Sequence, residues 1–399
     1  MHILYVSPYY WPEIIGSAPY TARLAEHLRD SGHQVTVFAF RPHYPNSSAF
    51  TAWADGSRDD EVHEGIRILR VPAMDRGGGG FLTRVLNDSR FMLTLLWAVL
   101  SGRIRRVDAI VCYVPSTLGL IGARIAKWLL RAPLIAVVHD IESGLASALS
   151  IARGKVFLAL MQAAERFGLN GSDRVVVSTT GMVEEVKRIG VRRPIEILPI
   201  WAELPPEIAR PPSDGYLLMY SGNFGKKQNL DQLIPLIRLL DQRRKDVTVR
   251  LQGEGSERAR LQSVLEGMGV SNTVFAPLAG QSEFLASIAS ADAHLVPQAH
   301  NVANYALPSK IISIMSVGRP FVCVADPGTT LDALAIDSGA GLCVAPGDDE
   351  ALFSAIDDLL SVPGRADAMG GKGREYVSKH MSAEAVLRRY EEIIVQSTG

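Results

Sequence analysis

Short apolar runs alternate with longer amphipathic stretches through the first half of the chain. The apolar runs, which predict strands, are HILYVS (2–7), QVTVFAF (34–40), IRILRV (66–71), DAIVCYV (108–114), PLIAVV (133–138), RVVVS (174–178) and IEILP (195–199). Apolar residues at helical spacing predict helices at about 19–31, 83–105, 117–130 and 155–170. Such alternation is typical of a parallel sheet with helices on both faces.

The second half repeats this organisation. Its predicted strands are YLLMYSG (216–222), VTVRLQG (247–253), TVFAPL (273–278), AHLVP (293–297) and PFVCVA (320–325). Helical periodicity covers 228–243, 256–268 and the stretch after residue 308, and a helical tail follows. Residues 198–215 contain five prolines and predict a stiff connector. The sequence therefore predicts an α/β protein with two doubly wound domains.

Composition agrees with this interpretation. A chain of 399 residues is too long for one core, and 47% hydrophobic and 21% charged residues are ordinary for globular domains. The first apolar run starts at residue 2 without a basic segment before it, so we interpret it as a strand and not as a signal peptide. Cys112, Cys323 and Cys343 lie in apolar runs without metal-binding spacing, which favours reduced thiols in a cytosolic protein.

The net charge of -1 conceals an asymmetry between the two halves. Residues 1–200 carry 23 Lys and Arg against 18 Asp and Glu, whereas the remainder carries 18 against 24. The basic half is where we expect an anionic surface or partner.

Ligands of open parallel sheets bind beyond the carboxyl ends of the strands. Gly16 and Ser17 follow the first strand and precede a helix. A glycine there lets backbone N–H groups approach a phosphate, although a plain turn and helix cap explain the same residues. His139 ends a buried strand at the same edge, where a lone histidine is either functional or an ordinary satisfied polar group.

Three loops of the second half follow strands in the same way. Gly222, Asn223 and Lys227 lie in a strand–loop–helix junction that resembles a phosphate cradle, but a solvated lysine pair is an equal alternative. Gly253 and Glu254 follow the next strand, where a tight turn is sufficient explanation. In NYALPSKIISIMSVGRP (304–320), Ser309 and Lys310 begin an apolar helix, which raises the question of an anion at that point.

Residues 89–106 form the most apolar segment of the chain. Its uncharged run, 91–101, is too short to span a bilayer. A core helix is one interpretation; we favour an interfacial helix attracted to anionic lipid. The arginines predicted to contact the membrane are Arg84, Arg90, Arg103, Arg105 and Arg106.

The chain resembles the retaining glycosyltransferases of family 4, which have the GT-B fold. The segments that carry the resemblance are LYVSPYYWPEIIGSAPYTARLAEHL (4–28), YSGNFGKKQNL (220–230), LQGEGSER (251–258) and ALPSKIISIMSVGRPFV (306–322). They look like the subgroup that works on bacterial surface polysaccharides, including the colanic acid fucosyltransferase and N-acetyl-L-fucosamine transferase types.

The resemblance implies two Rossmann-like domains that face a central cleft. Residues 1–200 would bind the acceptor, 201–381 would bind a nucleotide diphosphate sugar, and a helix at 382–399 would pack back on the first domain. His139, Lys227 and Lys310 would be catalytic. The residues implied in donor binding are Gly16, Ser17, Gly222, Asn223, Gly253, Glu254, Tyr305, Ala306, Leu307, Pro308, Ser309 and Ser313.

The sequence departs from the family pattern at three of these positions. Asn223 stands where the family has an arginine, and Tyr305 and Ser313 stand where it has two glutamates. The resemblance therefore leaves the ribose contacts uncertain, and Lys310 would supply the charge of the missing arginine.

The implied reaction is retaining transfer of a sugar from a nucleotide diphosphate, expected to be UDP, to a polyprenyl diphosphate-linked saccharide. We expect no cofactor, no metal and no nucleic acid, and a location on the cytoplasmic face of the plasma membrane in bacterial polysaccharide or lipopolysaccharide synthesis. Two alternatives stay open at this point: a GT-B nucleotide-sugar 2-epimerase, and a non-catalytic pseudo-transferase that binds the nucleotide sugar.

Overall fold

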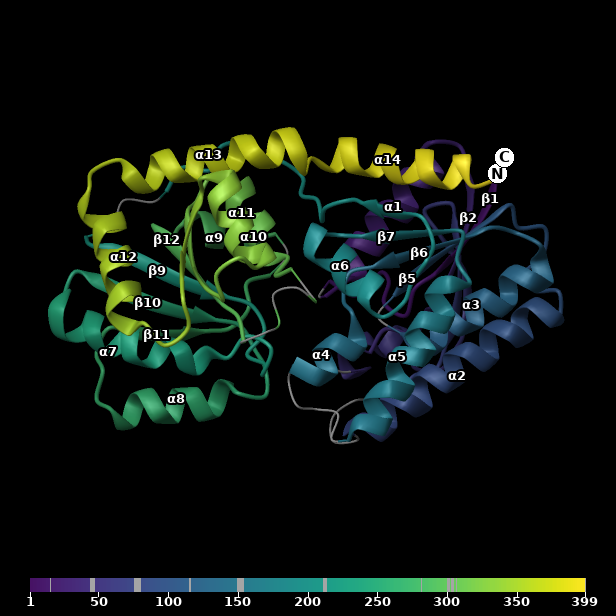
Figure 1. Ribbon diagram of the computed structural model, residues 1–399, viewed down its shortest axis with the longest axis horizontal. Coiled ribbons are helices and arrows are strands. Elements are labelled where there is room, and N and C mark those ends of the chain that lie inside the picture. The colour runs from purple at the N-terminus through teal and green to yellow at the C-terminus, as the bar shows by residue number, and fades with distance from the viewer. Residues whose placement is uncertain are drawn as a thin grey trace. The chain divides into compact units, whose positions relative to one another are not determined.

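The computed structural model describes residues 1–14, 16–43, 47–74, 80–114, 116–148, 154–210, 214–280, 282–299, 302, 305 and 307–398. The chain forms two compact units, each an α/β unit with its own sheet (Figure 1). Unit 1 comprises Met1–Ser143, Ala152–Leu198 and Leu387–Gly399, and unit 2 comprises Gly144–Ile151 and Pro199–Val386.

The sheet of unit 1 has the strand order β3-β4-β2-β1-β5-β6-β7-β8. Neighbouring strands are parallel except β3, which pairs antiparallel with β4 at the edge. The strands are β1 (His2–Val6), β2 (Gln34–Phe40), β3 (Asp60–His63), β4 (Ile66–Val71), β5 (Ala109–Val114), β6 (Leu134–Val138), β7 (Arg174–Val177) and β8 (Ile195–Ile197). The central strands are buried on both faces, which explains their unbroken apolar runs.

Polar caps fix several helix starts in unit 1. The Ser116 hydroxyl accepts the Gly119 N–H at 3.0 Å at the start of α3, and Thr179 accepts the Met182 N–H at 3.2 Å at the start of α6. The helices of unit 1 are α1 (Ala18–Asp30), η1 (Ser47–Trp53), α2 (Gly80–Leu100), α3 (Thr117–Leu130), α5 (Lys155–Asn170) and α6 (Thr180–Arg188), and α4 (Glu142–Ala148) begins in unit 1 and continues into the Gly144–Ile151 segment of unit 2.

The end of the chain belongs to unit 1. Helix α14 (Ala383–Gln396) carries Glu391, whose carboxylate lies 2.9 Å from His27 Nε2 and 3.2 Å from His33 Nε2. Ser31 donates to the same carboxylate at 2.8 Å. These bonds fasten residues at the end of the sequence to the first helix of the unit.

Unit 2 has a six-stranded, fully parallel sheet in the order β11-β10-β9-β12-β13-β14. Its strands are β9 (Tyr216–Ser221), β10 (Val247–Gln252), β11 (Thr273–Ala276), β12 (Ala293–Pro297), β13 (Phe321–Val324) and β14 (Gly341–Val344). Its helices are η2 (Leu230–Gln232), α7 (Leu233–Arg243), α8 (Arg258–Gly267), α9 (Phe284–Ala289), α10 (Lys310–Ser316), α11 (Thr330–Ser338), α12 (Asp349–Ser361) and α13 (Arg365–His380). The prediction of two doubly wound α/β sheets is confirmed.

Some expected boundaries were wrong. The helix expected to reach residue 105 ends at Leu100, because Gly102 turns the chain with a φ of 75°. Arg103, Arg105 and Arg106 therefore lie in the loop after α2, not on a basic helix face. Strand β14 lies in the tail that was expected to be helical, and strand β3 and helices α4 and α6 were not expected.

Candidate functional site

Three loops of unit 2 follow neighbouring strands, β10, β9 and β12, at the carboxyl edge of the sheet. Backbone hydrogen bonds join the first two loops. Gly222 N–H donates to Gln252 O at 2.9 Å, and Phe224 N–H donates to Glu254 O at 2.8 Å. The two glycine-containing loops therefore form one continuous backbone surface.

Glycine is required at two points of this surface. Gly222 and Gly253 have φ values of 144° and 140°, which other residues rarely adopt. A Cβ atom on Gly253 would lie 1.9 Å from Gly222 O, and one on Gly222 would lie 2.9 Å from Lys310 Nζ. A side chain at Gly222 would therefore collide with the Lys310 ammonium, and a side chain at Gly253 would collide with the backbone of Gly222.

Lys310 is the most unusual charged group of unit 2. Its Nζ is buried, lies 3.8 Å from the centroid of the Tyr220 ring and has no hydrogen-bond partner among the described residues. Burial lowers the pKa of Lys310 to about 7. A buried cation without a partner is costly, and its cost falls when an anion binds beside it. The arrangement is chemically suited to hold a phosphate oxyanion.

Tyr220, the last but one residue of β9, holds the loop after this strand and contacts Lys310. Its hydroxyl donates to Asn223 O at 2.5 Å, and its ring makes a cation–π contact with the Lys310 ammonium. Burial raises the pKa of Tyr220. Tyr220 was missed by the sequence interpretation, although its position next to the end of a strand at the ligand edge was the available signal.

The structure brings several other predicted donor residues to the same edge. Lys227 O accepts the Ala299 N–H at 3.0 Å, which ties the loop after β9 to the loop after β12. The Glu254 carboxylate accepts from Arg258 at 3.0 Å and is 62% exposed. Leu307, Pro308, Ser309 and Ser313 lie at or near the start of α10, Tyr305 donates its N–H to Val302 O at 2.9 Å, and Ala306 lies outside the described residues.

In unit 1, His139 follows β6 at the carboxyl edge. The Tyr113 hydroxyl is hydrogen-bonded to His139 Nδ1, and His139 Nε2 is buried without a partner among the described residues. Burial lowers the pKa of His139 to about 4, so the ring is neutral at pH 7. Tyr113, whose pKa is raised by burial, was missed by the sequence interpretation.

Gly16 and Ser17 lie in the loop before α1. Gly16 has a φ of 68°, and a Cβ there would meet nothing within 4 Å, so its glycine serves the backbone conformation. Ser17 makes no side-chain cap to α1. The ring of Tyr20, on the first turn of α1, lies 6.4 Å from the His139 ring, centroid to centroid.

The five predicted membrane arginines do not form one cluster. Arg84 is paired with Glu142, whereas Arg90 is exposed on α2. Arg103 donates to Asp60 at 3.3 Å, and Arg105 donates to Gly102 O at 2.7 Å. Arg106 lies beside these two and lines a hollow of about 440 Å³ with them. The membrane interpretation therefore depends on a different surface.

That surface is formed by α2, α3 and α5, which lie side by side in Figure 1. Each helix exposes at least two large apolar side chains, among which Trp97 and Trp128 are 66% and 79% exposed. We call this set the apolar face: Leu86, Leu93, Trp97, Leu100, Ile125, Trp128, Val156, Leu160 and Phe167.

In the described part of the chain, no helix has both the length and the apolar character needed to span a membrane. The described residues also contain no group of three or more His, Cys, Asp and Glu side chains placed to bind a metal ion.

Two α/β units, each with a mainly parallel sheet, are the defining feature of the GT-B class of folds. Sucrose-phosphate synthase of Thermosynechococcus elongatus superposes with a TM-score of 0.79 at 18% identity, covering 99% of this chain and 98% of that one. Anabaena Alr3699/HepE in complex with UDP superposes with a TM-score of 0.73 at 14% identity, covering 99% and 100%. At these identities the likeness establishes the fold.

The family follows from sequence models. Residues 16–201 match the model "Glycosyl transferase 4-like domain", and residues 205–376 match "Glycosyl transferases group 1". The two matches together account for most of the chain, which is therefore a glycosyltransferase built from these two domains. The predicted GT-B glycosyltransferase is confirmed, while the fucosyltransferase subgroup stays a prediction.

Two curated relatives align over nearly their whole lengths. WcaI of Escherichia coli (strain K12), whose name describes a colanic acid biosynthesis glycosyl transferase, is 28% identical over 412 residues, covering 98% of both chains. The glycosyltransferase WbjE of Pseudomonas aeruginosa is 23% identical over 401 residues, covering 96% of this chain and 92% of its own.

Proposed function

We propose that the chain transfers a sugar, with retention, from a nucleotide diphosphate sugar to a saccharide on polyprenyl diphosphate. The observation that carries the proposal is the buried ammonium of Lys310 beside Gly222, which has no hydrogen-bond partner among the described residues. The names of WcaI and the UDP complex of Anabaena HepE favour bacterial surface polysaccharide synthesis and UDP as the carrier.

In this mechanism Lys310 and Lys227 contact the donor diphosphate. As the bond from the anomeric carbon to the diphosphate breaks, negative charge grows on the leaving phosphate oxygens. A cation already placed there stabilises that charge without reorganisation. Gly222, Asn223 and Gly253 provide backbone at the same place.

The ribose is proposed to bind at the start of α10. Ser309 and Ser313 lie there, with Leu307 and Pro308 before them and Tyr305 further upstream. Ser313 has one hydroxyl where the family has a carboxylate. A neutral hydroxyl bond is roughly half as strong as a charge-assisted one. We therefore propose that backbone groups before the helix hold much of the ribose.

His139 is proposed to contact the donor sugar as a neutral hydrogen-bonding group. When Tyr113 donates to Nδ1, the ring proton is on Nε2, which is then free to donate to a sugar hydroxyl. A pKa of about 4 makes His139 unsuitable as a general base at pH 7. Gly16 and Ser17 stay predicted contacts of the donor.

We also propose that unit 1 binds the inner face of the plasma membrane through the apolar face. The charges on its three helices support anionic lipid as the partner. Asp88 and Glu165, the only acidic residues of α2, α3 and α5, are both buried. The same helices carry six basic residues: Arg84, Arg90, Arg124, Lys127, Lys155 and Arg166. Exposed tryptophans with basic neighbours are typical of interfacial binding.

A donor panel tests the function. Purified chain is incubated with UDP-, GDP- and dTDP-sugars and a polyprenyl diphosphate saccharide, and the product's anomeric configuration is determined by NMR. We expect transfer with retention that survives excess chelator. Hydrolysis-independent conversion of the donor sugar would instead identify an epimerase, and tight nucleotide binding without turnover would identify a pseudo-transferase. Inversion, or a requirement for added Mg²⁺ or Mn²⁺, would refute those parts of the proposal.

A further inference from the structure

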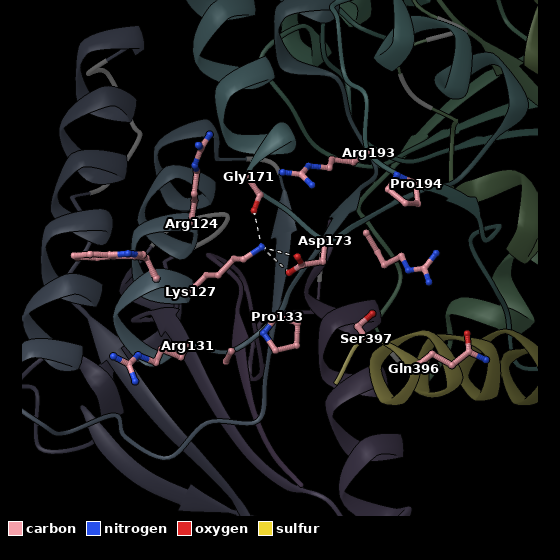
Figure 2. A pocket seen from close by; sticks show the side chains of 13 residues that line it. Arg124, Lys127, Arg131, Pro133, Gly171, Asp173, Arg193, Pro194, Gln396 and Ser397 are labelled. Atoms are coloured by element: carbon pink, nitrogen blue, oxygen red, sulfur yellow. Dashed lines mark hydrogen bonds and ion pairs between the residues drawn. The ribbon is translucent and has the colours of Figure 1, made fainter. Parts of the chain in front are cut away.

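A second candidate site lies at the opposite edge of the unit 1 sheet from His139. A pocket of about 780 Å³ opens at the amino ends of β6, β7 and β8 (Figure 2). We call it the amino-edge pocket. Its lining residues are Arg124, Lys127, Trp128, Arg131, Ala132, Pro133, Gly171, Asp173, Arg174, Arg193, Pro194, Gln396 and Ser397.

The amino-edge pocket is separate from the catalytic edge. Pro133 precedes β6 and lines the pocket, whereas His139 follows β6. Six residues of extended chain at about 3.3 Å each place them roughly 20 Å apart. A ligand here would therefore not compete with the sugar for His139.

The pocket carries a strong excess of positive charge. Five of its lining residues are basic and one, Asp173, is acidic. Both Asp173 oxygens lie 2.7 Å from Lys127 Nζ, and one also accepts the Leu134 N–H at 2.8 Å. The single carboxylate is thus already neutralised by the single lysine. Arg174 is paired with Glu196 at 3.5 Å, which leaves the charge of Arg124, Arg131 and Arg193.

These three arginines have guanidinium N–H groups that are not all used in hydrogen bonds to described residues. Arg124 donates to the carbonyl of Phe167, and Arg193 donates through Nε to Asn170 O at 2.7 Å. The Arg131 guanidinium has no partner among the described residues and is exposed. In Figure 2 the guanidinium groups of Arg124 and Arg131 point away from the Asp173 carboxylate. A guanidinium has five donors in a fork that fits phosphate oxygens, so most of these donors are available to an anion.

The pocket also borders the apolar face. Trp128 belongs to both, and Phe167 packs against the Arg124 guanidinium at 3.7 Å from its ring centroid. A ligand with a phosphate group next to an apolar portion matches this combination of surfaces. Phospholipid headgroups and polyprenyl phosphates have that chemistry, and a free phosphate ester has the polar half of it.

We propose that the amino-edge pocket binds the phosphate group of an anionic ligand, with Arg131 and Arg193, which lie on different sides of the pocket in Figure 2, as the exposed arginines that line it. In its lipid form the proposal rests on the membrane association proposed above, with the lipid seated beside Trp128. In either form it requires no donor or acceptor, so it can be tested apart from sugar transfer.

The test compares two double variants of equal charge in the full chain. Arg131→Ala/Arg193→Ala removes the two exposed arginines of the pocket, and Arg90→Ala/Lys155→Ala removes two exposed cations outside it. Binding to phosphatidylglycerol–phosphatidylcholine vesicles is measured by co-sedimentation. Binding of soluble glycerol 3-phosphate and inorganic diphosphate is followed by Trp128 fluorescence, with Trp128→Phe identifying the signal.

Both double variants lose the same diffuse attraction to the vesicles, because each removes two cations. We expect the pocket variant to lose at least about tenfold more affinity than its control, since its hydrogen bonds to phosphate are also lost. An excess loss on vesicles alone identifies a lipid headgroup. If the pocket variant loses as much affinity for soluble phosphates as for vesicles, relative to its control, the ligand is a free phosphate ester. Equal vesicle binding by the two variants, with no soluble phosphate bound by the parent, would overturn the proposal.

Discussion

Replacing Lys310 by methionine should stabilise unit 2 while it removes donor binding. Methionine keeps a long unbranched side chain of similar length but has no charge to bury. Since the Lys310 ammonium is buried and no described residue pairs with it, the folded protein bears a cost that the variant lacks. The two effects, opposite in sign, separate a functional lysine from a structural one.

The magnitude follows from the pKa. Burial lowers the pKa of Lys310 from its ordinary 10.5 to about 7. Each pKa unit corresponds to about 1.4 kcal/mol, so the charged form costs on the order of 5 kcal/mol in the folded state. The unfolded chain binds more protons between pH 7 and 10.5, so the stability of the parent rises with pH through that window. The advantage of the variant should therefore shrink by about 2.5 kcal/mol between roughly pH 6.5 and roughly pH 9.

Urea denaturation at the two pH values gives the free energies of unfolding. Pulsed hydrogen exchange on peptides from β9 and α10 assigns the transition to unit 2, since the two units need not unfold together. Calorimetry with UDP at about pH 8, in buffers of different ionisation enthalpy, measures linked protons. With a pKa of about 7, Lys310 should take up about 0.9 proton when the diphosphate binds.

Lys226→Met is the matched control, because Lys226 is an exposed lysine in the same group of loops. It should change neither the pH dependence of stability nor the proton uptake. A Lys310→Met protein that is less stable than the parent at both pH values, together with UDP binding that takes up no proton, would refute the reasoning.

Three smaller perturbations test other parts of the two units. For His139, kcat/KM should show no imidazole limb between roughly pH 5.5 and roughly pH 9, since burial lowers the pKa of His139 to about 4; such a limb, lost in His139→Asn, would show a titrating ring. Burial raises the pKa of Glu165 to about 7, so the stability of the parent falls as pH rises from 4.5 towards 7, and thermal melts of Glu165→Gln should lack this fall. Ser313→Ala should lower kcat/KM by about fivefold at most, the value of one neutral hydrogen bond, and a loss as large as that of Lys310→Ala would reverse the proposed ribose and phosphate subsites.

Continuous apolar runs predicted the central strands well, because a parallel strand buried on both faces has no polar side. Strand β13, with the sequence FVCV, is buried at every position. Strand β3 has the sequence DEVH and alternates between exposed and half-buried positions at the edge of the sheet. Its stability comes from pairing with β4, a long-range contact that local pattern does not reveal.

The sequence predicted where along the chain the site residues lie, but not how their side chains contact one another. The rule that ligands bind beyond strand ends located Lys310, Gly222 and His139 from the sequence. It did not reveal that the Lys310 ammonium lies over Tyr220, because that contact requires β9 and β12 to be neighbours. The absence of a partner for a buried group is a property of the whole surroundings, which no local motif encodes.

The arginines beyond α2 illustrate the same limit for surfaces. Arg103 and Arg105 were expected on a helix face, but the chain leaves the helix at Leu100 and both side chains bond to nearby protein groups. The basic residues that keep available donors are instead on α3 and in the turn before β8. Whether a surface arginine can bind an anion depends on which acceptors already surround it, and this is decided by tertiary structure.

The two edges of the unit 1 sheet differ in the charge of the side chains that they present, and this difference matters for the proposed reaction. At the carboxyl edge, burial holds both His139 and Tyr113 in their neutral forms. At the amino edge, Arg131 and Arg193 are exposed and charged. A phosphate-bearing lipid would therefore be favoured at the amino edge, whereas an uncharged sugar finds neutral hydrogen-bonding groups at the other. Since β6 joins the two edges, the roughly 20 Å from Pro133 to His139 sets how far the saccharide of a lipid held in the amino-edge pocket must extend to reach His139. An acceptor with a short saccharide would have to bind elsewhere, so the dependence of kcat/KM on saccharide length reports which edge holds the acceptor's phosphate.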